Sequence, residues 1–176
     1  MSLFGVERVK YKIGDTIIHW THGLGTIVAI EKKDMDGVTQ QYFVVKFELF
    51  KVWVPVEEAN EGSIRFPADS IQFKLLFDIL RMPGELLPEF QYQRKLELRE
   101  RMQKMSLGGL CHVIRDLKDR SRMHTLNQND SSVLLRAEAN LLDEWVLSLG
   151  TERAHAQSEL EVLLHEGIAV STQDAA

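Results

Sequence analysis

The chain has 176 residues, a net charge of −5 and one cysteine. No apolar run approaches the roughly 18 residues that a membrane-spanning helix needs, and residues 1–12 lack a secretory signal pattern, so we expect a cytoplasmic protein with no membrane partner. The single cysteine, Cys111, excludes an internal disulfide, which suits a reducing compartment. The length fits one domain or two small ones, since domains commonly have about 50 to 200 residues.

Charge is distributed unevenly along the chain. Residues 73–125 contain eleven Lys and Arg against seven Asp and Glu, a balance of +4, whereas residues 1–72 balance at −2 and residues 126–176 at −7. A basic middle segment favours contact with phosphate groups, although lysines and arginines that only solvate helices would give the same count.

The first third of the chain alternates apolar and polar residues in short runs, which is typical of β strands. It predicts strands at residues 16–19, 25–32, 41–47 and 51–56, joined by turns that contain glycine and aspartate. Pro55 is expected at a strand end or an edge, because proline has no N–H to donate. These strands predict a small, strongly bent antiparallel sheet or barrel.

From residue 66 onward the apolar spacing becomes helical. We expect one helix between Asp69 and Pro83, a second from Pro88 to about Met105, and further helices near residues 107–120, 131–149 and 151–166. The predicted buried faces of these helices contain Ile71, Leu75, Leu76, Ile79, Leu80, Leu98, Met102, Met105, Leu107, Leu110, Cys111, Ile114, Leu117, Leu134, Leu135, Leu141, Leu142, Trp145 and Leu149. The predicted division is a β domain at 1–66, a helical domain at 67–167 and a flexible tail at 168–176.

Motifs of catalysis and of metal binding are missing from the sequence. His19 and His22 are three residues apart, but zinc needs three or four ligands, and a strand end followed by a tight turn explains the pair equally well. The sequence contains no G-x-S-x-G, no G-x-x-x-x-G-K and no H-E-x-x-H motif. We therefore expect no enzyme, no metal and no cofactor.

Two longer stretches carry a family resemblance. "GDTIIHWTHGLGTIVAIEKKDMDG" and "YFVVKFELFKVWVPVEEANEGSIR" resemble the RNA polymerase-interacting domain of the bacterial CarD/CdnL family, a domain that the transcription-repair coupling factor also contains. The matching positions are Gly14, Asp15, His22, Gly23, Gly25, Ile30, Glu31, Gly37, Tyr42, Val54, Pro55, Val56, Gly62 and Arg65. "HVIRDL" at residues 112–117 is similar to the third-helix motif of CarD, and the chain is too short for a helicase motor.

The resemblance implies both a fold and a function. The fold is α+β, with an N-terminal Tudor-like, SH3-like small β-barrel followed by an all-α C-terminal helical bundle. The function is transcription regulation by a monomer in the nucleoid, without catalysis: the β domain binds the RNA polymerase β subunit, and the helical domain binds promoter DNA at the upstream edge of the bubble and stabilises the open complex. The alternative is an adaptor that docks on polymerase and uses its acidic C-terminal helices to recruit another protein.

On the β domain, the resemblance places the polymerase-binding residues at Lys33, Lys46, Lys51 and Trp53, beside an exposed sheet edge. Lys33 stands where relatives have a basic contact residue, and its alternative is an ordinary turn lysine. Trp53 stands where some relatives have arginine, so it is either an apolar anchor or a buried barrel tryptophan.

On the helical domain, relatives have a wedge tryptophan where this chain has Gln91. The flanking Phe90 and Tyr92 are candidates for that role, although Phe90 also fits a bundle core. We predict phosphate contacts for Arg94, Lys95 and Arg99, with pairing to Glu97 and Glu100 as the alternative. A second possible basic face contains Arg115, Lys118 and Arg122.

Overall fold

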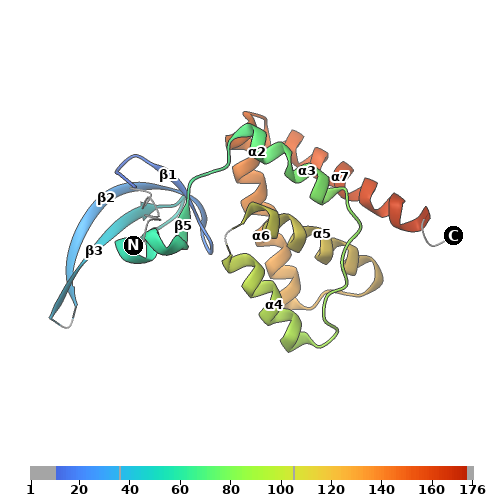
Figure 1. The fold of residues 1–176 in the computed structure, drawn as a ribbon, viewed down its shortest axis with the longest axis horizontal. Coiled ribbons are helices and arrows are strands. Elements are labelled where there is room, and N and C mark those ends of the chain that lie inside the picture. Colours follow the sequence, from blue (N-terminus) through green and yellow to red (C-terminus); the bar gives the residue numbers. More distant parts are fainter. Residues whose placement is uncertain (1–10, 36, 105, 174–176) are drawn as a thin grey trace, which may run out of the picture. The chain divides into compact units, whose positions relative to one another are not determined.

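The computed structural model describes residues 11–35, 37–104 and 106–173 (Figure 1). The chain divides into two units, residues 1–66 and residues 67–176, each with its own hydrophobic core. The first unit contains a sheet and the second contains only helices, so the predicted α+β class is confirmed. No helix among the described residues is long and apolar enough to cross a membrane.

The first unit, which we call the β unit, is a five-stranded antiparallel sheet. Its strands are β1 (Thr16–His19), β2 (Gly23–Met35), β3 (Val38–Lys46), β4 (Lys51–Pro55) and β5 (Ile64–Arg65), in the order β4-β3-β2-β1-β5 (Figure 1). A register shift between Ile27 and Ala29 marks a β-bulge in β2, and bulges bend the strand that contains them. The four predicted strands are present, and Pro55 ends the edge strand β4.

One face of the sheet forms the core of the β unit. Ile17, Ile27, Val45 and Val54 are buried there together with Phe43, at positions that alternate along their strands. A helical turn, α1 (Val56–Glu58), and a wider turn, η1 (Ala59–Ser63), lead from β4 to β5. Neither these turns nor β5 was predicted, because two to five residues are too few for a period to appear.

The second unit, which we call the helical unit, contains six helices. They are α2 (Ser70–Lys74), α3 (Leu76–Leu80), α4 (Gln91–Gln103), α5 (Leu107–Met123), α6 (Gln128–Leu149) and α7 (Arg153–Gln173). Gly150 ends α6 in the left-handed conformation with φ of 63°, as its position predicts. Helix α7 extends to Gln173, so most of the segment expected to be a flexible tail is helical.

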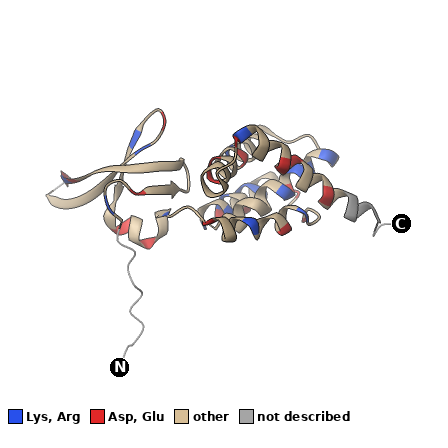
Figure 2. Cartoon of the chain, turned by 90° about the horizontal axis from the view of Figure 1, so that it is seen from above, with Lys and Arg blue, Asp and Glu red and all other residues tan. Residues whose placement is uncertain are grey.

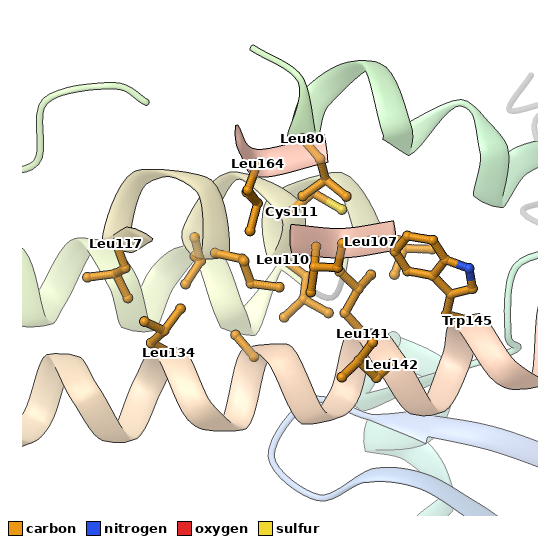
Figure 3. Close-up of a cluster of buried hydrophobic side chains, with 14 of the residues drawn as sticks. Leu80, Leu107, Leu110, Cys111, Leu117, Leu134, Leu141, Leu142, Trp145 and Leu164 are labelled. Atoms are coloured by element: carbon orange, nitrogen blue, oxygen red, sulfur yellow. The ribbon is translucent and has the colours of Figure 1, made fainter. Parts of the chain in front are cut away.

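The core of the helical unit lies between α5, α6 and α7 (Figure 3). All five residues predicted for the buried face of α5 are buried, namely Leu107, Leu110, Cys111, Ile114 and Leu117. Burial raises the pKa of the Cys111 thiol to about 12, so this residue packs as a small apolar side chain.

The first helical segment differs from its prediction. Ile71 and Leu75 are exposed, whereas the unpredicted Phe73 is fully buried and its ring contacts those of Phe77 and Trp145. The Asp69 side chain caps α2, and Leu75, between α2 and α3, keeps helical dihedral angles. The buried face therefore runs through both short helices as Phe73, Leu76, Phe77 and Leu80, and the prediction chose a face rotated from it by about one residue.

Other core predictions need correction. Leu135 is exposed on α6, and Leu76, Ile79 and Leu149 are only partly buried. Met105 lies outside the described residues.

His19 and His22 form part of the β1–β2 turn. The Nδ1 atom of His19 accepts hydrogen bonds from the backbone N–H of Thr21 at 3.1 Å and of His22 at 3.4 Å, and the two imidazoles stack 4.8 Å apart. Among residues 11–35, 37–104 and 106–173, no three His, Cys, Asp or Glu side chains gather as metal ligands. The pair therefore organises a turn. Burial, with the neighbouring His22, lowers the pKa of His19 to about 4.

The corrected face of α2 generates a stability prediction. Phe73→Ala should lower the free energy of unfolding of the helical unit by about 3–5 kcal/mol, because it leaves a cavity beside Trp145. Leu75→Ala should change that free energy by less than about 0.5 kcal/mol, since Leu75 is exposed. Urea denaturation followed by circular dichroism measures both values, and an equal cost for the two substitutions would contradict the assignment of Phe73 and not Leu75 to the buried face.

The turn histidine generates a pH prediction. The folded β unit favours neutral His19, whereas the unfolded chain takes up a proton near the usual pKa of 6.5, so stability should fall as the pH drops from about 6.5 towards 4. His19→Asn keeps a hydrogen-bond acceptor but removes the titration, so it should flatten this dependence. Urea titrations at several pH values, read from the amide NMR signals of β1 and β2, measure the effect.

The matched control is His155→Asn in α7, where the side chain is 73% exposed. It should leave the pH dependence of β1 and β2 unchanged. Identical pH profiles for the intact protein and His19→Asn would contradict the assignment of this titration to His19.

Candidate functional site

The strand register brings the four predicted polymerase-binding residues to one face of the β unit. Lys46 pairs with Lys51 and Val44 with Trp53 across β3 and β4, while Lys33 pairs with Gln40 across β2 and β3. Side chains of paired residues lie on the same side of a sheet, and residues two apart in a strand share that side. The face with Lys33, Lys46, Lys51 and Trp53, which we call the outer face, is therefore opposite the core.

Trp53 is an exposed residue held in place by two neighbours. Its side chain remains 40% exposed, and its indole Nε1 donates a 2.7 Å hydrogen bond to Glu31 Oε2. The Lys33 ammonium lies 3.9 Å from the centroid of the indole ring, which is a cation–π contact. Trp53 is thus not a buried barrel tryptophan, and Lys33 contacts it. The aromatic ring is presented outward in a fixed orientation.

The outer face continues to an open sheet edge. β4 pairs only with β3, so its other side carries backbone groups without a strand partner among the described residues. The ribbon of β2 and β3 also exposes the apolar side chains Val28, Ile30 and Val38. Of these, Val38 shares the side of Gln40 and so belongs to the outer face, whereas Ile30 pairs with the buried Phe43 and lies on the core side.

In the helical unit, α4 presents an exposed stripe. Tyr92, Lys95 and Arg99 recur every three or four residues, which places them on one side of the helix, and all three are exposed. Phe90, the residue that immediately precedes α4, is 74% exposed, and Tyr92 is 72% exposed. Phe90 is therefore not part of the bundle core.

Lys95 and Arg99 do not have the partners that the alternative assigned to them. Glu97 binds Arg101, and Glu100 binds Lys104 at 2.9 Å. Among the residues that the structure describes, no carboxylate forms an ion pair with Lys95 or Arg99. Their charges are therefore available to a ligand.

Arg94 differs from the other predicted phosphate contacts because it lies in the interior. Its side chain is 5% exposed and its Nε donates to Asp130 Oδ2 at 2.7 Å. Its Nη1 donates to the carbonyl oxygens of Pro88 at 2.7 Å and Glu89 at 2.9 Å. This correction has a simple cause: Arg94 is one residue before Lys95, and a step of about 100° around the helix takes its side chain to the inner side.

The second predicted basic face is largely neutralised. Arg115 is 3% exposed and lies against Asp116, Lys118 binds Glu138 at 2.8 Å, and Arg122 lies 3.4 Å from Asp119. Basic and acidic residues alternate along the helices of this unit (Figure 2). Most lysines and arginines of residues 73–125 are therefore engaged in ion pairs.

The far end of α4 is anchored to α5. Arg101 Nη1 donates to Asp116 Oδ2 at 2.6 Å, and Asp116 is fully buried. The Asp116 carboxylate also accepts hydrogen bonds from Arg115 Nε at 2.8 Å and from the backbone N–H of Glu85 at 2.9 Å. The Arg-Asp pair within "HVIRDL" is therefore structural.

Comparison with known families matches both units. The model described as "CarD-like/TRCF RID domain", an RNA polymerase-interacting domain, matches residues 11–66, and the model described as "CarD, C-terminal domain" matches residues 75–161. Together the two matches cover most of the chain, in the order that the resemblance of the sequence predicts.

Two relatives from Bacillus subtilis (strain 168) agree with this result. The protein named "Putative transcription factor YdeB" is 27% identical over 139 residues, which are 76% of this chain and 89% of that protein. The "Transcription-repair-coupling factor" is 31% identical over 65 residues, which are 34% of this chain but only 6% of that protein. The chain belongs to the CarD family of transcription factors, in which an RNA polymerase-interacting domain precedes the family's C-terminal domain.

Proposed function

We propose that this protein binds the RNA polymerase β subunit through the outer face and edge of its β unit, and promoter DNA through α4, and that as a monomer it stabilises the open promoter complex. The observation that carries the DNA part is the exposed stripe of α4. Within the part of the chain that the structure describes, Lys95 and Arg99 have no ion-pair partner, and two exposed aromatic residues lie at the N-terminal end of the same helix, whereas the other basic residues of α4 are ion-paired or buried.

A protein can stabilise the open complex only if it binds melted DNA better than closed duplex, because a ligand shifts an equilibrium by its difference in affinity for the two states. Lys95 and Arg99 would contact phosphates, which both states contain. The preference for melted DNA over closed duplex must then come from groups that interact with unpaired bases.

Phe90 and Tyr92 supply such groups. Gln91, at the wedge position of the family, cannot stack on bases as an indole does, but the two residues beside it are aromatic and exposed. Stacking of an aromatic side chain on an unpaired base contributes roughly 1–3 kcal/mol, and insertion of apolar side chains holds base steps apart. We assign the fork contact to this aromatic pair.

On the β unit, the proposed contact combines an apolar anchor with a backbone edge. Aromatic side chains are enriched among the residues that dominate binding energy, and Trp53 is already oriented by Glu31 and Lys33. Its fixed position reduces the entropy that docking must remove. The open side of β4 could add the partner's strand by backbone hydrogen bonding.

An adaptor function is the second candidate, and one observation favours it. Leu86 and Met123 are 100% and 80% exposed and line a hollow together with Leu87, Asp119 and Arg120. A protein partner could cover these apolar side chains. The salt dependence of DNA binding distinguishes the two candidates, because only phosphate contacts release counterions.

The DNA contact predicts the behaviour of a charge-reversal variant. Lys95→Glu with Arg99→Glu should weaken binding to a forked promoter DNA and reduce the slope of log affinity against log salt by at least roughly 1.4, which corresponds to two lost phosphate contacts. Fluorescence anisotropy at several salt concentrations measures both quantities. In transcription with purified polymerase, the same variant should shorten the lifetime of competitor-resistant promoter complexes.

The control is Lys74→Glu with Arg136→Glu, which changes the net charge equally at two exposed positions on α2 and α6. This variant should keep most of the affinity and of the salt slope. Unchanged DNA binding and salt slope in the α4 variant would instead support the adaptor.

The polymerase contact predicts the effect of removing the indole. Trp53→Ala should weaken binding of the full chain to isolated β subunit by about thirtyfold, since residues that dominate an interface contribute roughly 2 kcal/mol or more. Isothermal titration calorimetry measures this change. Ile13→Ala removes another exposed apolar side chain of the β unit and should have little effect, whereas equal affinities for Trp53→Ala and the intact chain would exclude the outer face as the docking surface.

A further inference from the structure

Arg94 organises the chain segment that leads into α4. Its backbone N–H donates to the carbonyl of Phe90 at 3.0 Å, and its guanidinium donates to the carbonyls of Pro88 and Glu89. One residue thus binds three consecutive carbonyl groups. Phe90 itself provides no side-chain cap for α4, so these bonds fix the start of the helix.

Asp130, the ion-pair partner of Arg94, is also held in place by its neighbours. Asp130, which accepts from Arg94 Nε, is 1% exposed in its side chain and lies in the first turn of α6. Asn127 caps that turn: its Oδ1 accepts from the Asp130 N–H at 2.9 Å, and its Nδ2 donates to Asp130 Oδ2 at 3.1 Å. The positive end of the α6 dipole also favours the carboxylate there.

We propose that Arg94 and Asp130 are a positioning pair, which holds Phe90 and Tyr92 in the orientation that discriminates forked from closed DNA. This inference rests on the proposed function and assigns its selectivity to two residues that do not touch DNA. The pair connects α6 to the backbone directly before Phe90, and Tyr92 follows within the first turn of α4. A contact that depends on stacking requires its side chains within about 0.5 Å of the productive geometry, which supporting residues must provide.

Stability alone does not account for such a pair. Removing two charges from water is costly, and replacing a buried ion pair by apolar residues of similar volume is often neutral or stabilising. The bonds from Arg94 to Pro88 and Glu89, by contrast, would be lost in that replacement, since an apolar side chain donates no hydrogen bond. Unlike an apolar pair, the charged pair therefore also fixes the backbone conformation of residues 88–90.

The test uses the full chain with Arg94→Met and Asp130→Leu together. We expect a melting temperature close to that of the intact protein, because no unpaired charge remains. Affinity for closed duplex and its salt slope should be unchanged, since Lys95 and Arg99 remain exposed. The preference for forked over duplex DNA should fall about tenfold, which corresponds to about 1.4 kcal/mol.

Two further variants provide a matched control and a second test of Arg94. Lys118→Met with Glu138→Leu removes the ion pair between α5 and α6 and should preserve the preference for the fork. Arg94→Lys keeps the charge but lacks the planar fork of donors, so it should lose fork preference even if the double variant does not fold.

The possible failures are distinguishable. A folded Arg94→Met, Asp130→Leu protein, or a folded Arg94→Lys protein, that discriminates as well as the intact chain overturns the positioning role. An intact protein that binds forked and duplex DNA equally, or neither of them, overturns the proposed DNA function instead.

Discussion

Two ion pairs, one near each end, orient α4, a helix with few buried apolar side chains. Only Leu98 and Met102 contribute buried apolar side chains. Arg94 binds Asp130 of α6 near the first turn, and Arg101 binds Asp116 of α5 near the last. The side of α4 that faces the other helices therefore contains two arginines beside two apolar residues. This arrangement determines which side chains of α4 remain exposed. The exposed stripe of Tyr92, Lys95 and Arg99 follows from the way in which that inner side is satisfied.

A buried carboxylate can serve this purpose only when most of its hydrogen-bonding capacity is used. Asp116 meets this condition with donors from Arg101, Arg115 and the backbone of Glu85, so one side chain joins α4, α5 and the non-helical segment between α3 and α4. That segment contributes few buried apolar residues, Leu87 among them. Arg115 and Asp116 of "HVIRDL" thus help to hold α4 in place, while Ile114 and Leu117 of the same motif belong to the core.

Periodicity predicted the strands and helices in which apolar residues recur at regular spacing. It could not predict the role of a residue where a partner far away in the sequence determines that role. The four long strands and the buried face of α5 follow from alternation and helical spacing. Neighbouring basic residues, in contrast, look equivalent: Arg94 and Lys95 differ in role only because Asp130, 36 positions away, lies opposite one of them. The exposed Ile71 shows a related limit, since the apolar residues of 71–80 fit two helical faces, and packing of Phe73 against Phe77 and Trp145 selects the face without Ile71.

Only a minority of the lysines and arginines of the helical unit lack an ion-pair partner among the described residues, and this bears on the proposed use of two units. Most basic residues of the helical unit are neutralised by neighbours, and the chain is acidic overall. Two phosphate contacts would give only weak affinity for free DNA. Tethering through the β unit would raise the effective concentration of α4 at the promoter to about millimolar, at which a weak and selective contact is enough. If α4 binds melted DNA as proposed, its selectivity would matter more than its strength, because polymerase binding through the β unit would supply the localisation.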